Sequence, residues 1–122
     1  MIRIFLSTLL AAAIASPALA AEDHKPAHGG VVVETKAGDM ELVAKPDRMV
    51  LHLSDHGKPM KLTSGTGKIT VFNGNEKAEA PLMLVGDTLE AKGSFKVPAG
   101  TKVLADVSLN GKPAVAARFT LK

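Results

Sequence analysis

The chain has 122 residues, no cysteine, tryptophan or tyrosine, and a formal charge of +3 at pH 7. The absence of cysteine excludes disulfides, thiolate catalysis and zinc sites of the cysteine type. Lysines alternate with acidic residues, so the sequence lacks the basic patch and stacking aromatic residues of nucleic-acid-binding proteins. We expect no nucleic-acid partner, and any metal must be bound by His, Met, Asp, Glu or the amino terminus.

Residues 1–20 have the pattern of a secretory signal peptide. Arg3 supplies the positive start, residues 4–14 are almost wholly apolar, and a small-residue stretch with an A-x-A ending follows. The apolar run is shorter than the roughly 20 residues of a membrane-spanning helix. We expect cleavage after Ala20, or alternatively after Ala21, a periplasmic mature protein and no stable membrane insertion.

Residues 21–29 form a leader that we expect to be flexible and that contains His24 and His28. Pro26 between them excludes a helix interior, so the two rings are not fixed on one helical face. Zinc, copper and nickel all accept imidazole, which is largely neutral near pH 7. The two histidines are therefore candidate metal ligands, and the alternative is a solvated leader without a role.

Cleavage after Ala21 would place His24 third in the mature chain. A free amine, two amide nitrogens and a third-position imidazole form a square-planar set that suits Cu(II) or Ni(II). Cleavage after Ala20, which the A-x-A ending favours, would place His24 fourth instead.

Residues 30–122 predict one small antiparallel β-sandwich of the immunoglobulin-like kind, with about seven to eight short strands. Short apolar runs alternate with turn signals such as KPDR, DHGKP, NGN and NGK. The expected strands cover residues 31–35, 40–45, 48–54, 68–72, 77–85, 88–92, 102–109 and 114–121. Asn110 and Gly111 are expected to form the tight turn of the last hairpin.

Period-two patterning predicts which residues face the core. The inward set in the second half of the chain is Ile69, Val71, Val103, Ala105, Val107, Leu109, Val115, Ala117, Phe119 and Leu121. Pairing about the KPDR turn sets Ala44, Leu42 and Met40 opposite Met49, Leu51 and Leu53. A slip of one residue would turn these apolar side chains outward, which supports this register. The register also places Glu41 opposite His52 on the outer face, and Asp39 opposite Ser54.

His52 and His56 form a second pair, four residues apart. On an extended strand this spacing separates them by about 13 Å, so they can share an ion only if the chain turns sharply at Asp55. His52 has a closer candidate partner in Glu41. The plainer interpretation is an exposed His–Glu pair that contributes under about 1 kcal/mol.

Met60 follows the DHGKP turn and is a candidate soft ligand, with His56, for Cu(I). Met40 and Met49 fall on the inward face, where they are expected to fill the core. The candidate metal ligands are thus His24 and His28, then His52, His56 and Glu41, and lastly Met60.

Motifs of common enzymes are missing. TSGTGK, residues 63–68, lacks the first glycine of a phosphate-binding loop and the Ser or Thr after its lysine. No G-x-S-x-G sequence is present. We expect no catalytic residues and no enzymatic activity.

The stretches HGGVVVE, LHLSDHGKP, SGTGKITVF and VAARFTLK carry a family resemblance. The chain resembles small exported bacterial proteins that begin with HGG after the signal and end in an ARFTL-like strand. Similar stretches occur as a domain in periplasmic adaptor subunits of heavy-metal efflux systems. The resemblance covers roughly residues 27–122, and it falls on residues 28–30 and 55–59.

The sequence, with this resemblance, predicts a periplasmic accessory protein that binds one copper or zinc ion and assists metal efflux or tolerance. The alternative is a metal-free interaction module that docks through a sheet edge on an envelope or efflux complex. The same fold serves either function.

Overall fold

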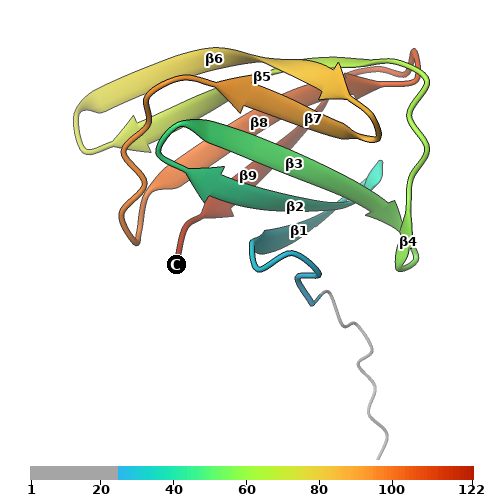
Figure 1. Cartoon of the computed structure of the whole chain (residues 1–122), viewed down its shortest axis with the longest axis horizontal. Coiled ribbons are helices and arrows are strands. Elements are labelled where there is room, and N and C mark those ends of the chain that lie inside the picture. The colour runs from blue at the N-terminus through green and yellow to red at the C-terminus, as the bar shows by residue number, and fades with distance from the viewer. Residues whose placement is uncertain (1–24) are drawn as a thin grey trace, which may run out of the picture.

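The fold is described from a computed structural model of the whole chain (Figure 1). The structure describes residues 25–122. The predicted signal peptide, both candidate cleavage sites and His24 lie outside the described residues.

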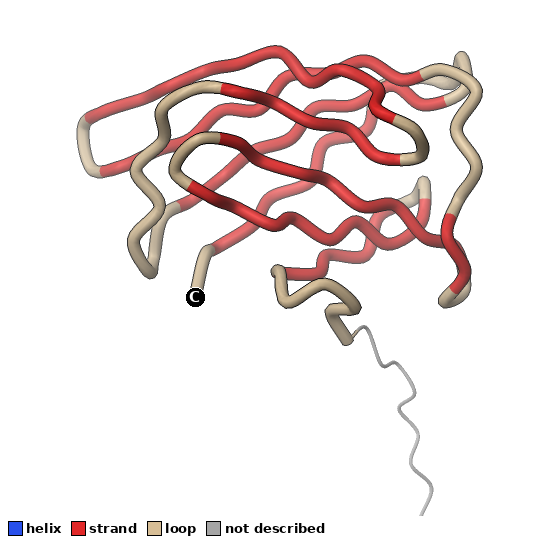
Figure 2. The backbone as a smooth tube through the Cα atoms, viewed as in Figure 1, coloured by secondary structure: helices blue, strands red, loops and turns tan. Residues whose placement is uncertain are grey.

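The described part of the chain is all-β, as predicted (Figure 2). Its strands are β1 Val31–Thr35, β2 Gly38–Lys45, β3 Arg48–Asp55, β4 Lys58–Pro59, β5 Gly65–Asn73, β6 Glu76–Val85, β7 Thr88–Lys92, β8 Lys102–Leu109 and β9 Val115–Thr120. Eight of them match the eight predicted runs, and β4 is a two-residue arm where only a turn was predicted. No helix occurs in residues 25–122, hence none that is long and apolar enough to cross a membrane.

All ladders are antiparallel and join the strands into one sheet in the order β1-β2-β3-β7-β6-β5-β8-β9, with β4 paired to β3. The sheet curls until β1 lies near β9, which gives a nearly barrel-like shape (Figure 1). No hydrogen-bonded ladder joins β1 to β9 in the described range. The two outer edges of the sheet, on β1 and β9, therefore face each other across a seam.

The predicted register across the KPDR turn is confirmed. Met40 pairs with Leu53, Leu42 with Leu51 and Ala44 with Met49. Glu41 is opposite His52, as expected. The inward residues form one buried core, which consists of Met40, Leu42, Met49, Leu51, Leu53, Leu62, Ile69, Val71, Ala80, Leu82, Leu89, Ala91, Phe95, Val103, Ala105, Val107, Leu109, Ala117, Phe119 and Leu121. Every predicted inward residue is in this core except Ala44 and Val115, which pack against it half-buried.

Two tight turns in the described range have left-handed backbone at both central residues. His56 and Gly57 have φ of 52° and 81° in the β3–β4 hairpin, and Asn110 and Gly111 have φ of 50° and 76° between β8 and β9. Positive φ at both central residues is the geometry of the two-residue turn that matches strand twist. The predicted Asn110–Gly111 turn is confirmed, and its closing bond runs from Lys112 N–H to the Leu109 carbonyl, at 2.9 Å.

Replacing Asn110 tests how much this turn stabilises the fold. Its Oδ1 accepts hydrogen bonds from Thr63 N–H at 2.8 Å and Ser64 N–H at 3.3 Å. Asn110→Ala removes these bonds and puts alanine in left-handed backbone, which Ala adopts less readily than Asn, so we expect a loss of about 1–3 kcal/mol in the free energy of unfolding. Asn110→Gly keeps the turn and should lose less. Urea unfolding measures both, and equal losses in the two variants would contradict the backbone contribution.

Candidate metal centre

Glu41 lies on the outer face of β2, where the sequence predicted an exposed carboxylate. The structure leaves only 6% of the residue accessible. The reason is the chain before β1, which folds across the carboxylate. Residues 27–30 therefore make a specific contact with the sheet.

The Glu41 carboxylate accepts four hydrogen bonds from this segment. Its Oε2 accepts the N–H groups of His28 and Gly30, each at 2.8 Å, and its Oε1 accepts the N–H of Ala27 at 3.1 Å. The Nδ1 of His28 lies 2.9 Å from the same Oε1. Hydrogen bonds to a charged acceptor are stronger than neutral ones, so a single side chain fixes the course of residues 27–30.

Gly30 permits this close approach. A β-carbon at this position would lie 2.2 Å from the carbonyl oxygen of Leu42. Any side chain would therefore push the leader away from β2. The second glycine of the HGG sequence is therefore required by packing.

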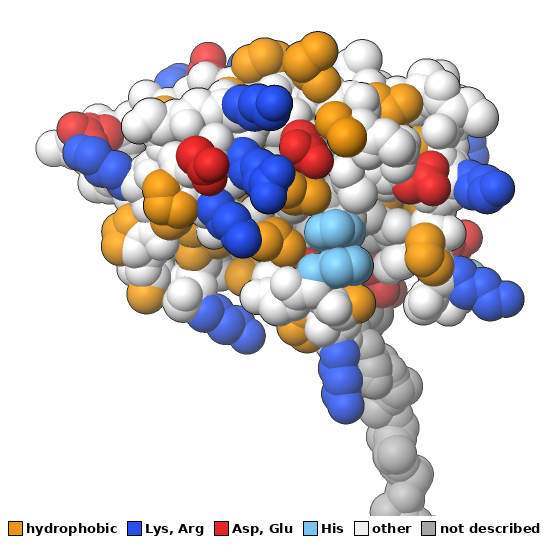
Figure 3. Space-filling model, viewed as in Figure 1, with side chains coloured by type: hydrophobic (Ala, Val, Ile, Leu, Met, Phe, Trp, Pro, Cys, Tyr) orange, Lys and Arg blue, Asp and Glu red, His pale blue; other side chains and the backbone are white. Residues whose placement is uncertain are grey.

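The ring of His28 stacks on the ring of His52 from β3. The ring centroids are 3.7 Å apart and the planes differ by 6°, and Figure 3 shows a stacked pair of histidine side chains at the surface. Glu41 contacts the first ring and faces the second across the ladder. The structure thus brings together three of the predicted ligands: His28 from the segment before β1, Glu41 from β2 and His52 from β3.

The carboxylate fixes the tautomer of His28. An ionised carboxylate only accepts, so the Nδ1 beside it carries the proton. In a neutral ring the Nε2 then holds the free lone pair. Burial alone would raise the pKa of Glu41, but hydrogen bonds from the His28 ring and from three backbone N–H groups hold this pKa below the ordinary 4.5. Glu41 is therefore ionised whenever imidazole is neutral.

His52 is half-buried, and its environment favours the neutral form. Burial and then the neighbouring His28 lower the pKa of His52 from the ordinary 6.5, against smaller opposing effects of Glu41 and Glu90. Two stacked imidazolium ions would repel each other. A neutral imidazole is the form that binds a metal ion.

A hollow of about 430 Å³ lies beside the stack, and all three histidines of the described range line it. His28 and His52 stand at one side, and His56 reaches the rim because the chain turns back at residues 55–58. The carboxylates in its lining are those of Asp39, Glu41 and Asp87. The sharp turn at Asp55 on which a shared His52–His56 site depended is present.

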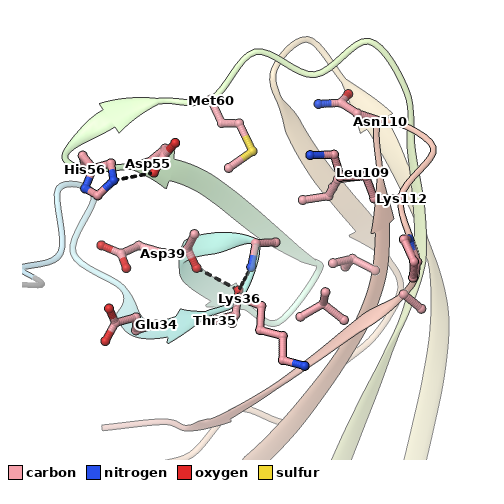
Figure 4. Close-up of a pocket in the computed structure, with 16 residues that line it drawn as sticks. Glu34, Thr35, Lys36, Asp39, Asp55, His56, Met60, Leu109, Asn110 and Lys112 are labelled. Atoms are coloured by element: carbon pink, nitrogen blue, oxygen red, sulfur yellow. Dashed lines mark hydrogen bonds and ion pairs between the residues drawn. The ribbon is translucent and has the colours of Figure 1, made fainter.

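His56 and Met60 do not form an evident pair. The His56 side chain is 94% exposed and its Nε2 lies 3.5 Å from Asp55 Oδ1. Met60 extends into a second cavity, at the end of the curled sheet, with Asp55 between the two residues in Figure 4. Both residues line that cavity.

The resting geometry of the stack does not hold an ion. A nitrogen lone pair lies in its ring plane, so two parallel rings 3.7 Å apart do not direct theirs at one point. Among residues 25–122, no group of three or more His, Asp or Glu side chains is arranged for metal binding. Binding at the stack requires at least one ring to turn.

Acidification should weaken the fold in two separate ranges. The unfolded chain protonates a histidine near pH 6.5, whereas folded His52 protonates at lower pH, so stability present above 6.5 is lost as the pH falls towards the folded pKa. The lowered pKa of Glu41 adds a second loss below pH 4.5. Urea unfolding between pH 7.5 and 3.5 measures both. His52→Gln should flatten only the upper range, and an unchanged upper range in this variant would contradict the assignment.

Comparison with known proteins assigns no family to this geometry. No family model matches the chain, and neither a curated protein nor a solved structure is similar enough to count as a match.

Proposed function

We propose that this protein is an exported, non-enzymatic accessory protein that binds one transition-metal ion, copper or zinc, and assists metal efflux or tolerance in the periplasm. The observation that carries the proposal is the contact between the buried Glu41 carboxylate and Nδ1 of His28. Metal-binding histidines usually donate their second N–H to a carboxylate, which orients the ring and makes it a better ligand.

Glu41 is, in this proposal, the orienting carboxylate and no ligand itself. Both its oxygens are already engaged by the leader. The Nε2 of His28 is the first ligand, on a side chain that is 49% exposed. Solvent exposure gives the ion a route of entry.

His52 is the second ligand. No hydrogen bond holds its ring within residues 25–122, so rotation about its side-chain bonds can break the stack and direct a nitrogen at an ion on His28. His24, four residues before His28, or water completes the coordination. Zinc with fewer than four protein ligands and copper with mixed ligands both keep water positions.

Metal binding should weaken below about pH 6.5, because a protonated imidazole does not coordinate. Zn(II) titration followed by imidazole ¹⁵N NMR tests the proposed roles. We expect the His28 Nε2 and one His52 nitrogen to shift while His28 Nδ1 keeps its proton. Imidazole signals that are unchanged at stoichiometric zinc would contradict the proposal.

A metal-free interaction module is the second candidate. The unpaired edges of β1 and β9 support it, since an extended partner segment can add to an open edge. These edges face each other across the seam, and each restricts access to the other. The absence of any stoichiometric metal complex would favour this candidate.

We also propose the finer fold class, an immunoglobulin-like sandwich formed by flattening of the curled sheet. The β6–β7 ladder spans only three residue pairs, Met83–Glu90, Leu84–Leu89 and Val85–Thr88. Sheet corners form where the chain passes from one layer to the other, and we place such a corner at this short ladder. One layer would then hold β1, β2, β3 and β7, and the other β6, β5, β8 and β9.

A further inference from the structure

The open end of the curled sheet holds a cavity that the metal site does not use. Its volume is about 860 Å³, within the roughly 300–1,000 Å³ range of small-molecule sites. The β1–β2 turn, the β3–β4 hairpin and the segment after β8 surround it. The mouth of such a curled sheet is a common position for ligand binding.

The floor of this cavity is apolar. Val107 and Leu109 from β8 are buried, and Val115 and Met60 are half-buried beside them. Figure 4 shows the Met60 side chain directed into the space, and its methyl group lies near Gly38, where an added β-carbon would come within 3.0 Å. A floor of this composition favours an apolar ligand body.

Charged side chains of both signs line the cavity. Lys36 and Lys112 line the cavity, and neither ammonium has an ion-pair partner in the described part of the chain. Glu34, Asp39, Asp55 and His56 are also in its lining. Asp55 contacts His56, and the carboxylates of Glu34 and Asp39 lie in Figure 4 on the side away from Lys112.

We propose that this cavity binds a small amphiphilic carboxylate, with its apolar chain on the Met60–Leu109 floor and its carboxylate at Lys36 and Lys112. Because neither lysine has an ion-pair partner within residues 25–122, both can gain a charge-assisted hydrogen bond from an anion. Burial of the chain supplies the main driving force. Binding requires no metal ion, so the site is independent of the histidine stack.

Decanoate titrated into metal-free protein in the presence of a chelator tests the proposal. The reporter is the Met60 methyl signal in ¹³C-methionine NMR, and Met83, which is 66% exposed on β6, is the internal control. We expect a saturable shift of Met60 and none of Met83. No Met60 shift at millimolar decanoate would overturn the proposal.

Charge variants test the lysine contacts. Lys36→Ala with Lys112→Ala should weaken decanoate binding at least about fivefold. The matched control is Lys45→Ala with Lys92→Ala. These lysines are the last residues of β2 and β7 and do not line the cavity, so the affinity for decanoate should change less than about twofold. Decylamine should bind at least about fivefold more weakly than decanoate. Equal or tighter binding of decylamine would show that the acidic side of the rim governs binding, and an unaffected Lys36/Lys112 variant would show that the lysines do not hold the carboxylate; either result would overturn the proposal.

Discussion

Glu41→Ala should lower the free energy of unfolding by about 2–4 kcal/mol. The buried carboxylate accepts three backbone N–H groups and contacts the His28 ring. Hydrogen bonds to a charged group contribute about 1.5–3 kcal/mol each, but the sum is limited because the freed leader detaches and is hydrated. The sheet should stay folded, since its core does not include Glu41.

Urea unfolding measures this loss, and hydrogen exchange locates it. We expect the Gly30 amide to lose protection while the amides of β5 and β8 keep theirs. Glu79→Ala is the matched control, because Glu79 is 43% exposed and its ion pairs with Lys68 and Lys77 are 3.5 and 3.8 Å long. Exposed pairs contribute about 0–1 kcal/mol. If both variants were equally stable, the leader would not be held by Glu41.

His28→Ala and His52→Ala should each weaken metal binding at least about tenfold, and the double variant should bind no ion at micromolar concentration. Each removes one of the two proposed imidazole ligands. His56→Ala is the control: its side chain is 94% exposed, and it should change affinity less than about twofold. Competition with a chromophoric chelator measures the affinity of the four variants and of the wild-type protein. Equal losses in the His28 and His56 variants would contradict the assignment of the ligands.

Glu41→Gln tests whether Glu41 orients the His28 ring, as opposed to coordinating the metal ion itself. The amide keeps the size of the side chain but presents an N–H₂ group where the carboxylate accepted N–H donors. Loss of an orienting partner typically costs 10–100-fold in metal affinity, which is the range we expect. The ¹⁵N spectrum should also show loss of the fixed Nδ1–H tautomer of His28, a change that reduced stability alone would not cause.

Much of the fold follows from local pattern. The KPDR turn and the alternation about it determine the β2–β3 register, because any slip would expose Met40, Leu42 and Leu51. Strand order was not predictable, since it depends on pairings such as β5–β8 between segments far apart in the chain. Curling of the sheet until β1 approaches β9 is likewise a property of the whole assembly.

The residues that meet at the candidate metal centre were predictable from the sequence, and their geometry was not. Glu41 and His52 were placed opposite each other by the register, and His28 was singled out by its sequence context. The fold of the leader over Glu41 was not predictable, because it depends on the close approach of Gly30 to the Leu42 carbonyl. A glycine pair directly before a strand, 11 residues ahead of an outer-face glutamate, is the one signal in the sequence that points to this contact.

Native mass spectrometry of the exported, processed protein, titrated with Cu(II) and Zn(II), tests the central claim most directly. The spectrum reports the mature amino terminus and the number of bound ions together. We predict one ion for the wild-type protein and none for the His28→Ala/His52→Ala variant. A complex that survives in this variant would assign the ion to the amino terminus and His24, and the absence of any complex in the wild-type protein would contradict the metal-binding function.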